Sequence, residues 1–181
     1  MSTVANRVDL LFNHPARLFA SLLPAVLALS LVLLANMPVS FTGGLLPVPA
    51  LALACVYFWV LVRPDLMPPI VVLLIGLAED LLSGGPPGLW AAGFLAALWL
   101  TDKQRETFAG LTGAGALIGF AGAMLFASAC AYVLAAIVYL RLAPVAPLLL
   151  QSTTTVIFYP LIAVSMGWML RNVVGPMRGG D

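Results

Sequence analysis

The chain of 181 residues is 62% hydrophobic and 8% charged, with a net charge of +1. Soluble domains carry about 25% charged residues, so this composition excludes an ordinary soluble domain and indicates an integral membrane protein with several spans. The charge balance gives no basic stripe for nucleic acid. The two cysteines, Cys55 and Cys130, both lie in apolar stretches, and no disulfide framework is expected.

Six apolar stretches predict an all-α membrane protein, folded as a single domain over residues 1–181. Residues 1–15 precede them, and because their apolar side chains share one helical face, we expect a short amphipathic helix on the cytoplasmic membrane surface. The six transmembrane helices are expected at about residues 18–36, 47–62, 66–83, 88–101, 108–140 and 147–170.

Three segments predict local features of these spans. Tyr57, Phe58 and Trp59 end the second span and are typical of an aromatic belt at the membrane interface. The charged segment Thr101–Thr107 is predicted to be a loop, which is either a solvated turn or a contact for soluble partners. The run Phe108–Leu140 would extend for roughly 50 Å as one helix, so it should tilt, kink or project from the bilayer.

The distribution of Lys and Arg predicts the orientation. With six spans, the two termini and the even-numbered turns share one side of the membrane, and the opposite side carries only Arg141. The positive-inside rule therefore places both termini in the cytoplasm and the turn Glu79–Gly88 on the outer side. The cations of the cytoplasmic side are Arg7, Arg17, Arg63, Lys103, Arg105, Arg171 and Arg178.

The segment Gly76–Gly88 places two adjacent carboxylates, Glu79 and Asp80, beside a turn rich in Gly and Pro. An Asp at the centre of a membrane helix costs about 2.5–3.5 kcal/mol on insertion scales, so it is rare without a reason. Neighbouring helical residues point about 100° apart, and the two carboxylates should not face one cleft. We expect Asp80 to accept hydrogen bonds from backbone donors of Ser83–Leu89 and so to lock the hairpin. Ligand or partner binding and proton transfer are the alternatives for Asp80.

A stripe of small residues follows the fifth stretch at every fourth position, which lets two helix backbones approach closely. Packing against other spans of the same chain is expected. The alternative is a seat for a transmembrane helix of another protein. The stripe consists of Gly115, Gly119, Ala123, Ala127, Ala131 and Ala135.

The sixth stretch begins with the polar run Gln151–Thr155. Its hydroxyls can bond to their own helix, whereas Gln151 requires an interhelical partner. Tyr159-Pro160 should kink the helix and free a carbonyl. One outward-facing polar cluster, either a pocket or an interhelical network, is predicted from Glu79, Asp80, Trp90, Arg141 and Gln151.

No catalytic, cofactor or metal site is predicted. The only histidine, His14, lies on the opposite side of the membrane from the two carboxylates, and Ser83 has no neighbouring base. The sequence has no zinc-binding motif, no nucleophile-elbow serine and no phosphate-binding glycine loop. We therefore expect a protein that is not an enzyme.

Several short motifs follow one another in the sequence: Tyr57-Phe58-Trp59, Arg63-Pro64, Gly76, Asp80-Leu81-Leu82-Ser83-Gly84 and Gly88. Their order resembles MreD, the rod shape-determining membrane protein family. The resemblance is clearest over residues 47–100, and Tyr159-Pro160 is similar to a late aromatic-proline pair of the family. Glu79 differs from the apolar neighbour that the aspartate usually has in the family. Pro87 stands where a leucine is common.

The resemblance implies a non-enzymatic scaffold in the bacterial inner membrane. It would bind MreC directly, join MreB, RodA and penicillin-binding protein 2 in the cell-elongation complex, and help to organise peptidoglycan synthesis and cell shape. The family also looks like the six-helix S components of energy-coupling-factor transporters, so the alternative is a small-molecule-binding subunit of a vitamin transporter. Membrane lipid is the other expected partner, and nucleic acid is not expected. The candidate structural or partner-binding residues are Glu79, Asp80, Ser83, Gly84, Gly88, Trp90, Gly115, Gly119, Ala123, Ala127, Arg141, Gln151, Tyr159 and Pro160.

Overall fold

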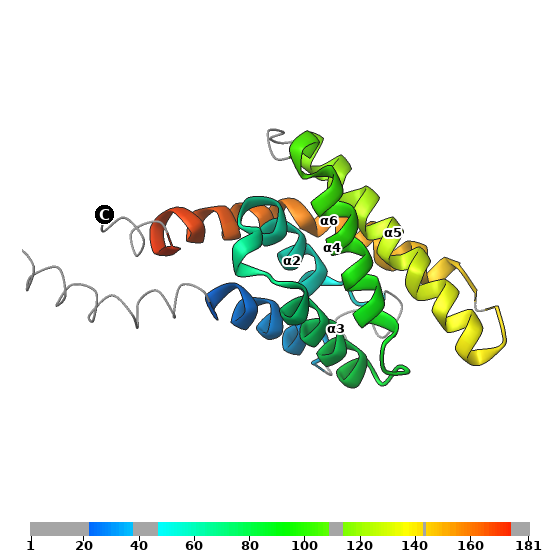
Figure 1. Ribbon diagram of the computed structural model, residues 1–181. Helices are drawn as coiled ribbons and strands as arrows, with labels where there is room; N and C mark the ends of the chain where they lie inside the picture. Colours follow the sequence, from blue (N-terminus) through cyan, green and yellow to red (C-terminus); the bar gives the residue numbers. More distant parts are fainter. Residues whose placement is uncertain (1–21, 38–46, 109–113, 143, 175–181) are drawn as a thin grey trace, which may run out of the picture.

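The computed structural model describes residues 22–37, 47–108, 114–142 and 144–174, and these ranges are helical throughout apart from short connections (Figure 1). The predicted all-α fold with six helices is confirmed, whereas the predicted surface helix over residues 1–15 lies outside the described residues. The helices are Leu22–Ala35, α2 (Leu51–Val62), α3 (Pro69–Ser83), α4 (Leu89–Phe108), α5 (Ala114–Tyr139) and α6 (Ala146–Met169), with a 3-10 turn η1 (Pro64–Leu66) after α2 and a π-helical turn η2 (Leu170–Val174) after α6.

The helices differ greatly in length. The 12 residues of α2 extend for about 18 Å, whereas the 26 residues of α5 extend for about 39 Å. Among the described helices, two are long and apolar enough to cross a membrane, Gly115–Tyr139 and Ala146–Asn172. Only 28% and 22% of their most apolar windows are buried inside the protein, so most of this apolar surface faces outward.

The boundaries of α4 and α5 correct two predictions. The charged segment Thr101–Thr107 is not a loop, because α4 continues through it to Phe108. Lys, Gln, Arg and Glu are good helix formers, and the Thr101 hydroxyl donates to the Ala97 carbonyl at 2.7 Å within the helix. The fifth helix begins at Ala114 rather than at Phe108, and residues 109–113 are outside the described ranges.

Helix α2 forms the centre of the molecule, between α4 and α6 (Figure 1). Nine of its 12 residues are buried, including Tyr57 and Trp59 at 3% and 0% exposure. The Tyr57 ring lies 5.2 Å from Phe120 of α5, which stacks on Tyr159 of α6 at 4.3 Å. The predicted aromatic belt is therefore wrong for Tyr57 and Trp59: because neighbouring helices enclose α2, its aromatic end faces the protein core.

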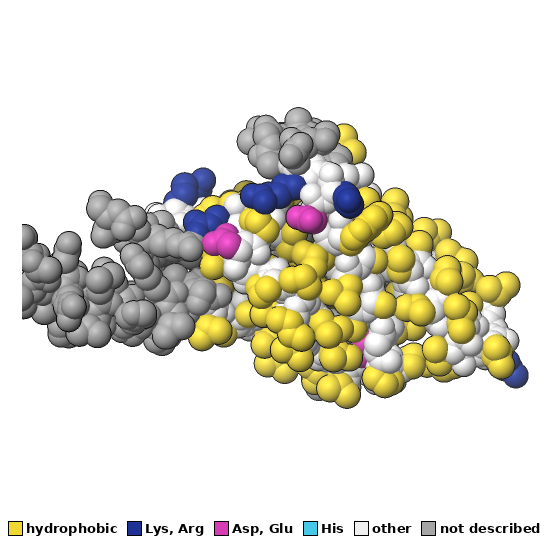
Figure 2. Space-filling model, in the orientation of Figure 1, with side chains coloured by type: hydrophobic (Ala, Val, Ile, Leu, Met, Phe, Trp, Pro, Cys, Tyr) yellow, Lys and Arg dark blue, Asp and Glu magenta, His cyan; other side chains and the backbone are white. Residues whose placement is uncertain are grey.

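Charged side chains lie at the ends of the helices. Arg63 follows α2, Lys103 and Arg105 lie in the last turns of α4, and Arg171 follows α6, whereas Arg141 follows α5. Figure 2 shows Lys and Arg side chains along the upper left of the molecule and an isolated basic side chain at its lower right tip, with a broad hydrophobic surface between them. Arg63 forms an ion pair with Asp65 at 3.2 Å.

Candidate functional site at the α3–α4 turn

Asp80 connects the end of α3 to the start of α4. Its Oδ1 accepts a hydrogen bond from the Trp90 N–H at 2.7 Å, and its Oδ2 accepts from the N–H groups of Gly88 and Ala91 at 2.8 and 3.2 Å. The residue is completely buried. The first N–H groups of a helix have no acceptor within it, and the helix dipole favours a negative charge there. Asp80 therefore caps α4 from another helix.

These distances confirm that Asp80 is the hydrogen-bond acceptor of the hairpin. Gly88 falls within the predicted donor segment Ser83–Leu89, whereas Trp90 and Ala91 lie just beyond it. Both carboxylate oxygens are occupied by backbone donors. These three bonds tie the side chain to the backbone at the start of α4.

Two glycines shape the turn that carries these donors. Gly84 ends α3 with φ +70°, and Gly88 precedes α4 with φ +101°. Both values lie in the left-handed region, which glycine adopts at little cost. The Ser83 hydroxyl donates to the Asp80 carbonyl at 3.3 Å, which satisfies one of the last carbonyls of α3. The candidates Ser83, Gly84 and Gly88 thus belong to the connection that Asp80 closes.

Gly76 permits the close approach of the two helices. A Cβ atom at Gly76 would lie 2.5 Å from the Ala91 Cα and 3.0 Å from the Ala91 nitrogen. Gly76 and Asp80 are one helical turn apart on the same face of α3. The candidate residues from the sequence omit Gly76. Its position four residues before the buried aspartate is the signal that would have identified it.

Glu79 faces a different helix from Asp80, as their spacing predicts. Glu79 is 8% exposed, and its carboxyl group accepts a hydrogen bond from the Asn36 amide at 3.3 Å, at the end of the first helix. The same amide nitrogen donates to the Val32 carbonyl at 2.9 Å. Sequence reasoning missed Asn36, although it is a polar residue at the end of an otherwise apolar span.

The predicted outward-facing polar cluster is not one hydrogen-bonded network. Gln151 donates a hydrogen bond to the Val48 carbonyl at 3.0 Å, so its partner lies in the segment before α2 rather than on another helix. Arg141 is exposed at the end of α5. Among the described residues, no hydrogen bond joins either of them to Glu79 or Asp80: Glu79 bonds to Asn36, Asp80 bonds to the start of α4, and Gln151 bonds to Val48.

The hydroxyls of the polar run in α6 bond to their own helix, as predicted. Thr153 donates to Leu149 at 2.8 Å, and Thr155 donates to Gln151 at 2.6 Å. Thr155 has a second role, because its hydroxyl accepts a hydrogen bond from the Ala50 N–H at 3.0 Å. Ala50 precedes α2, so α6 supplies the acceptor for a free donor at the start of the central helix.

Replacing Thr155 by Val is expected to lower the free energy of unfolding by about 1–2 kcal/mol, because the buried Ala50 N–H loses its acceptor. Thr153→Val is the matched control, since that hydroxyl is exposed and bonds only to its own helix. Denaturant titration of both variants in detergent micelles measures the difference. Equal stabilities would show that the contact between Ala50 and Thr155 contributes nothing.

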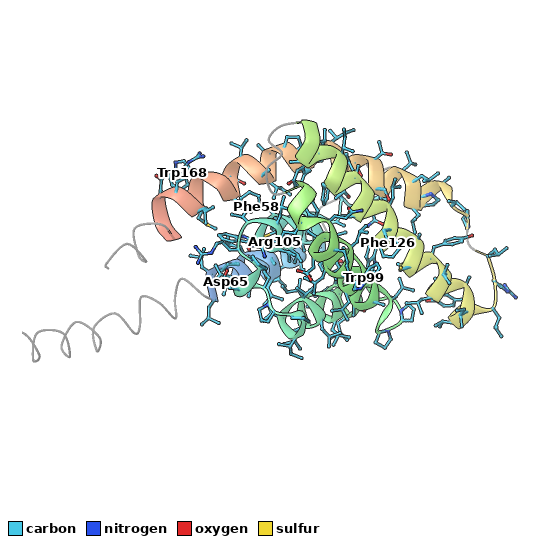
Figure 3. All side chains as sticks on the ribbon, turned by 45° about the horizontal axis from the view of Figure 1, so that its top comes forward. Phe58, Asp65, Trp99, Arg105, Phe126 and Trp168 are labelled. Carbon is cyan, nitrogen blue, oxygen red and sulfur yellow. The ribbon has the colours of Figure 1, made fainter. Side chains whose placement is uncertain are left out.

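The small-residue stripe of α5 packs inside the protein. Ala123, Ala127 and Ala131 are at most 2% exposed, and a Cβ at Gly93 of α4 would lie 3.1 Å from the Ala127 carbonyl oxygen. The stacked rings of Trp99 and Phe126, labelled in Figure 3, join the same two helices with their centroids 6.2 Å apart. Internal packing of the stripe is thus confirmed.

This packing disfavours the alternative for the stripe, a seat for a transmembrane helix of another protein. The buried candidates Gly119, Ala123 and Ala127 face the interior, and Gly115 at the beginning of α5 is half-buried. An incoming helix could reach Ala127 and Ala131 only if α4, which lies against them at Gly93, moved away. The stripe is therefore a structural element of the α4–α5 pair.

Tyr159 lies in the core, whereas Pro160 lies on the exposed face of α6. Tyr159 is 3% exposed in its stack with Phe120, whereas Pro160 is exposed. Helix α6 continues through Pro160 to Met169. Because proline has no N–H, the carbonyl four residues earlier lacks its usual helical donor.

The described residues contain no group of three or more His, Cys, Asp or Glu side chains that could hold a metal ion. Comparisons with protein-family models, curated proteins and solved structures find no match to this chain. What the site can do is therefore inferred from its own geometry: it joins two helices through a capped, tightly packed turn.

Proposed function

We propose that the protein is a non-enzymatic scaffold of the bacterial inner membrane that resembles MreD and binds MreC within the cell-elongation complex. The observation that supports this most directly is the hydrogen bonding of the Asp80 carboxylate. The segment in which the resemblance is clearest contains a buried carboxylate whose two oxygens accept three backbone hydrogen bonds. Such a group stabilises a shape, which is what a scaffold requires.

The surface of the molecule supports an integral membrane location with six spans and cytoplasmic termini. Large apolar side chains are exposed on the first helix and on α3, α5 and α6, for example Val26, Leu74, Ile137 and Leu161 at 57–68% exposure. Soluble monomers rarely expose contiguous apolar patches of this kind, whereas lipid-facing helices do. Arg63 and Arg171 follow even-numbered helices, and Lys103 and Arg105 lie in the last turns of α4, in agreement with the positive-inside orientation.

The outer turn remains as the partner surface, since the α5 stripe is buried. Leu81 and Leu82 lie beside the capped aspartate and are 77% and 47% exposed. Because Asp80 and the two glycines fix the turn, these two leucines are held in place at the end of α3. A rigid apolar projection binds a partner with less loss of conformational entropy than a mobile loop would.

Mass spectrometry of the protein purified mildly from its native membrane, with a tag at the carboxyl terminus, tests this function. We expect MreC and the enzymes of wall synthesis to be recovered with the wild type. Leu81→Ser should lower the recovery of MreC several-fold, whereas Leu74→Ser, an exposed leucine on the same helix, should not. Recovery of a transporter ATPase module or of a stoichiometric small molecule would instead favour a substrate-binding subunit.

A further inference from the structure

The helical hairpin of α3 and α4 is bounded by polar groups at both of its ends. At one end, the ion pair of Arg63 with Asp65 precedes α3, and Asp102 and Lys103 are exposed on α4. At the other end, residues 84–88 between the two helices are not helical and are partly exposed. Charged side chains are costly inside hydrocarbon, and lipid-exposed irregular backbone does not occur there. Both ends of the hairpin therefore have to reach headgroups or water.

The apolar length between these two ends is short. Helix α3 has 15 residues, Pro69–Ser83, and extends for about 22 Å. The apolar part of α4, residues 89–101, extends for about 20 Å. The hydrocarbon core of a typical bilayer is about 30 Å thick, so both lengths fall short of it by about 8–10 Å. Tilting a helix only shortens its projection on the membrane normal, so tilt cannot close this gap.

The exposed face of α3 is apolar from one end of the helix to the other. Ile70, Leu74 and Leu81 are 60%, 57% and 77% exposed, so this face meets lipid. The two long helices place a different demand on the membrane. The segments Gly115–Tyr139 and Ala146–Asn172 extend for about 37 and 40 Å, and helices longer than the core are accommodated by tilting. Figure 1 shows α6 running obliquely to α4.

We propose that the protein thins the bilayer beside α3 and α4, and that this side of the molecule binds lipids with short acyl chains in preference to long ones. Thinning is one of the ways in which a bilayer accommodates a short apolar segment. Long flanking side chains can reach the surface by snorkelling, but the backbone of residues 84–88 cannot. The inference rests on the proposed membrane location, and not on the binding of MreC.

Nitroxide labels at the two ends of α3 test the proposal. The full chain carries Ile70→Cys or Leu82→Cys, with Cys130→Ser so that the buried Cys55 is the only other thiol. In phosphatidylcholine vesicles with 18-carbon chains, accessibility to oxygen and to a water-soluble nickel complex gives the depth of each label below the nearer headgroups. The labels lie about 18 Å apart along the helix, so in an undeformed core their two depths add up to about 12 Å wherever the hairpin sits.

We expect the two depths to add up to less than about 6 Å, because thinning brings the headgroups to both ends of α3. A label at Leu74→Cys, between the two, should lie deeper than either. A sum of about 12 Å or more would overturn the proposal, and protein rather than headgroups would then have to cover the turn. Flotation with the vesicles checks the membrane location separately. A chain that does not float overturns the location and this inference together, whereas a large sum in floated protein overturns the inference alone.

The unlabelled wild type gives a second readout that needs no substitution. Its thermal unfolding midpoint, followed by circular dichroism, is compared in vesicles with chains of 14, 18 and 22 carbons. We expect the midpoint to fall as the chains lengthen, because each added carbon increases the mismatch at α3 and α4. A midpoint that stayed constant or rose with chain length would contradict the preference for short-chain lipids.

Discussion

Replacement of Asp80 by Asn is expected to lower the free energy of unfolding by about 2–4 kcal/mol. Asn offers one oxygen and one NH2 group where the carboxylate offers two oxygens. If the NH2 group replaces Oδ1, it faces the Trp90 N–H; if it replaces Oδ2, it faces the N–H groups of Gly88 and Ala91. In either orientation, at least one backbone N–H faces another donor. A buried donor without an acceptor costs about 1–3 kcal/mol, and the charge-assisted bonds are lost as well.

The measurement is a reversible denaturant titration of the purified chain in detergent micelles, followed by circular dichroism. Asp102→Asn is the matched control. Asp102 is exposed near the end of α4, so its replacement should change the free energy of unfolding by less than about 0.5 kcal/mol. If the two variants were equally stable, Asp80 would not hold the hairpin together, and the structural argument for a scaffold would lose its main support.

The role of Asp80 could be predicted because all of its partners are close in the sequence. Asp80 lies at the end of a helix, and a Gly/Pro turn and a second helix follow at once. Few backbone donors are therefore within its reach, and its most distant partner is 11 residues away. The six-helix arrangement followed from the apolar stretches for the same reason: the pattern that predicts each helix is local.

The contacts between distant parts of the chain could not be predicted in this way. Asn36 and Glu79 are 43 residues apart, and Ala50 and Thr155 are 105 apart. Tyr57 has the sequence position of a membrane-interface residue, and it is buried only because α5 and α6 cover it. The continuation of α4 through its charged end reflects helix propensity, which a loop prediction based on charge ignores.

Replacement of Gly76 by Ala is expected to destabilise the protein by about 3 kcal/mol or more. The new Cβ would lie 2.5 Å from the Ala91 Cα and 3.2 Å from the Trp90 carbonyl oxygen, and these are backbone atoms that no rotamer change can move. Helices α3 and α4 would have to separate. Overpacking in a core costs about 1–3 kcal/mol. The separation would also draw the N–H groups of Trp90 and Ala91 away from Asp80 and so weaken the hydrogen bonds that cap α4.

Gly122→Ala on α5 is the matched control, because a Cβ there meets no atom within 4 Å. Alanine is the better helix former by about 0.5–1 kcal/mol, so this variant should be as stable as the wild type or slightly more stable. The same Gly→Ala change is thus expected to lower the free energy of unfolding on α3 and to leave it unchanged or raise it on α5. The denaturant titration measures this difference directly. If Gly76→Ala were as stable as Gly122→Ala, α3 and α4 would not approach closely at Ala91. The Asp80 cap would then have to form without the close helix contact that brings its donors within reach.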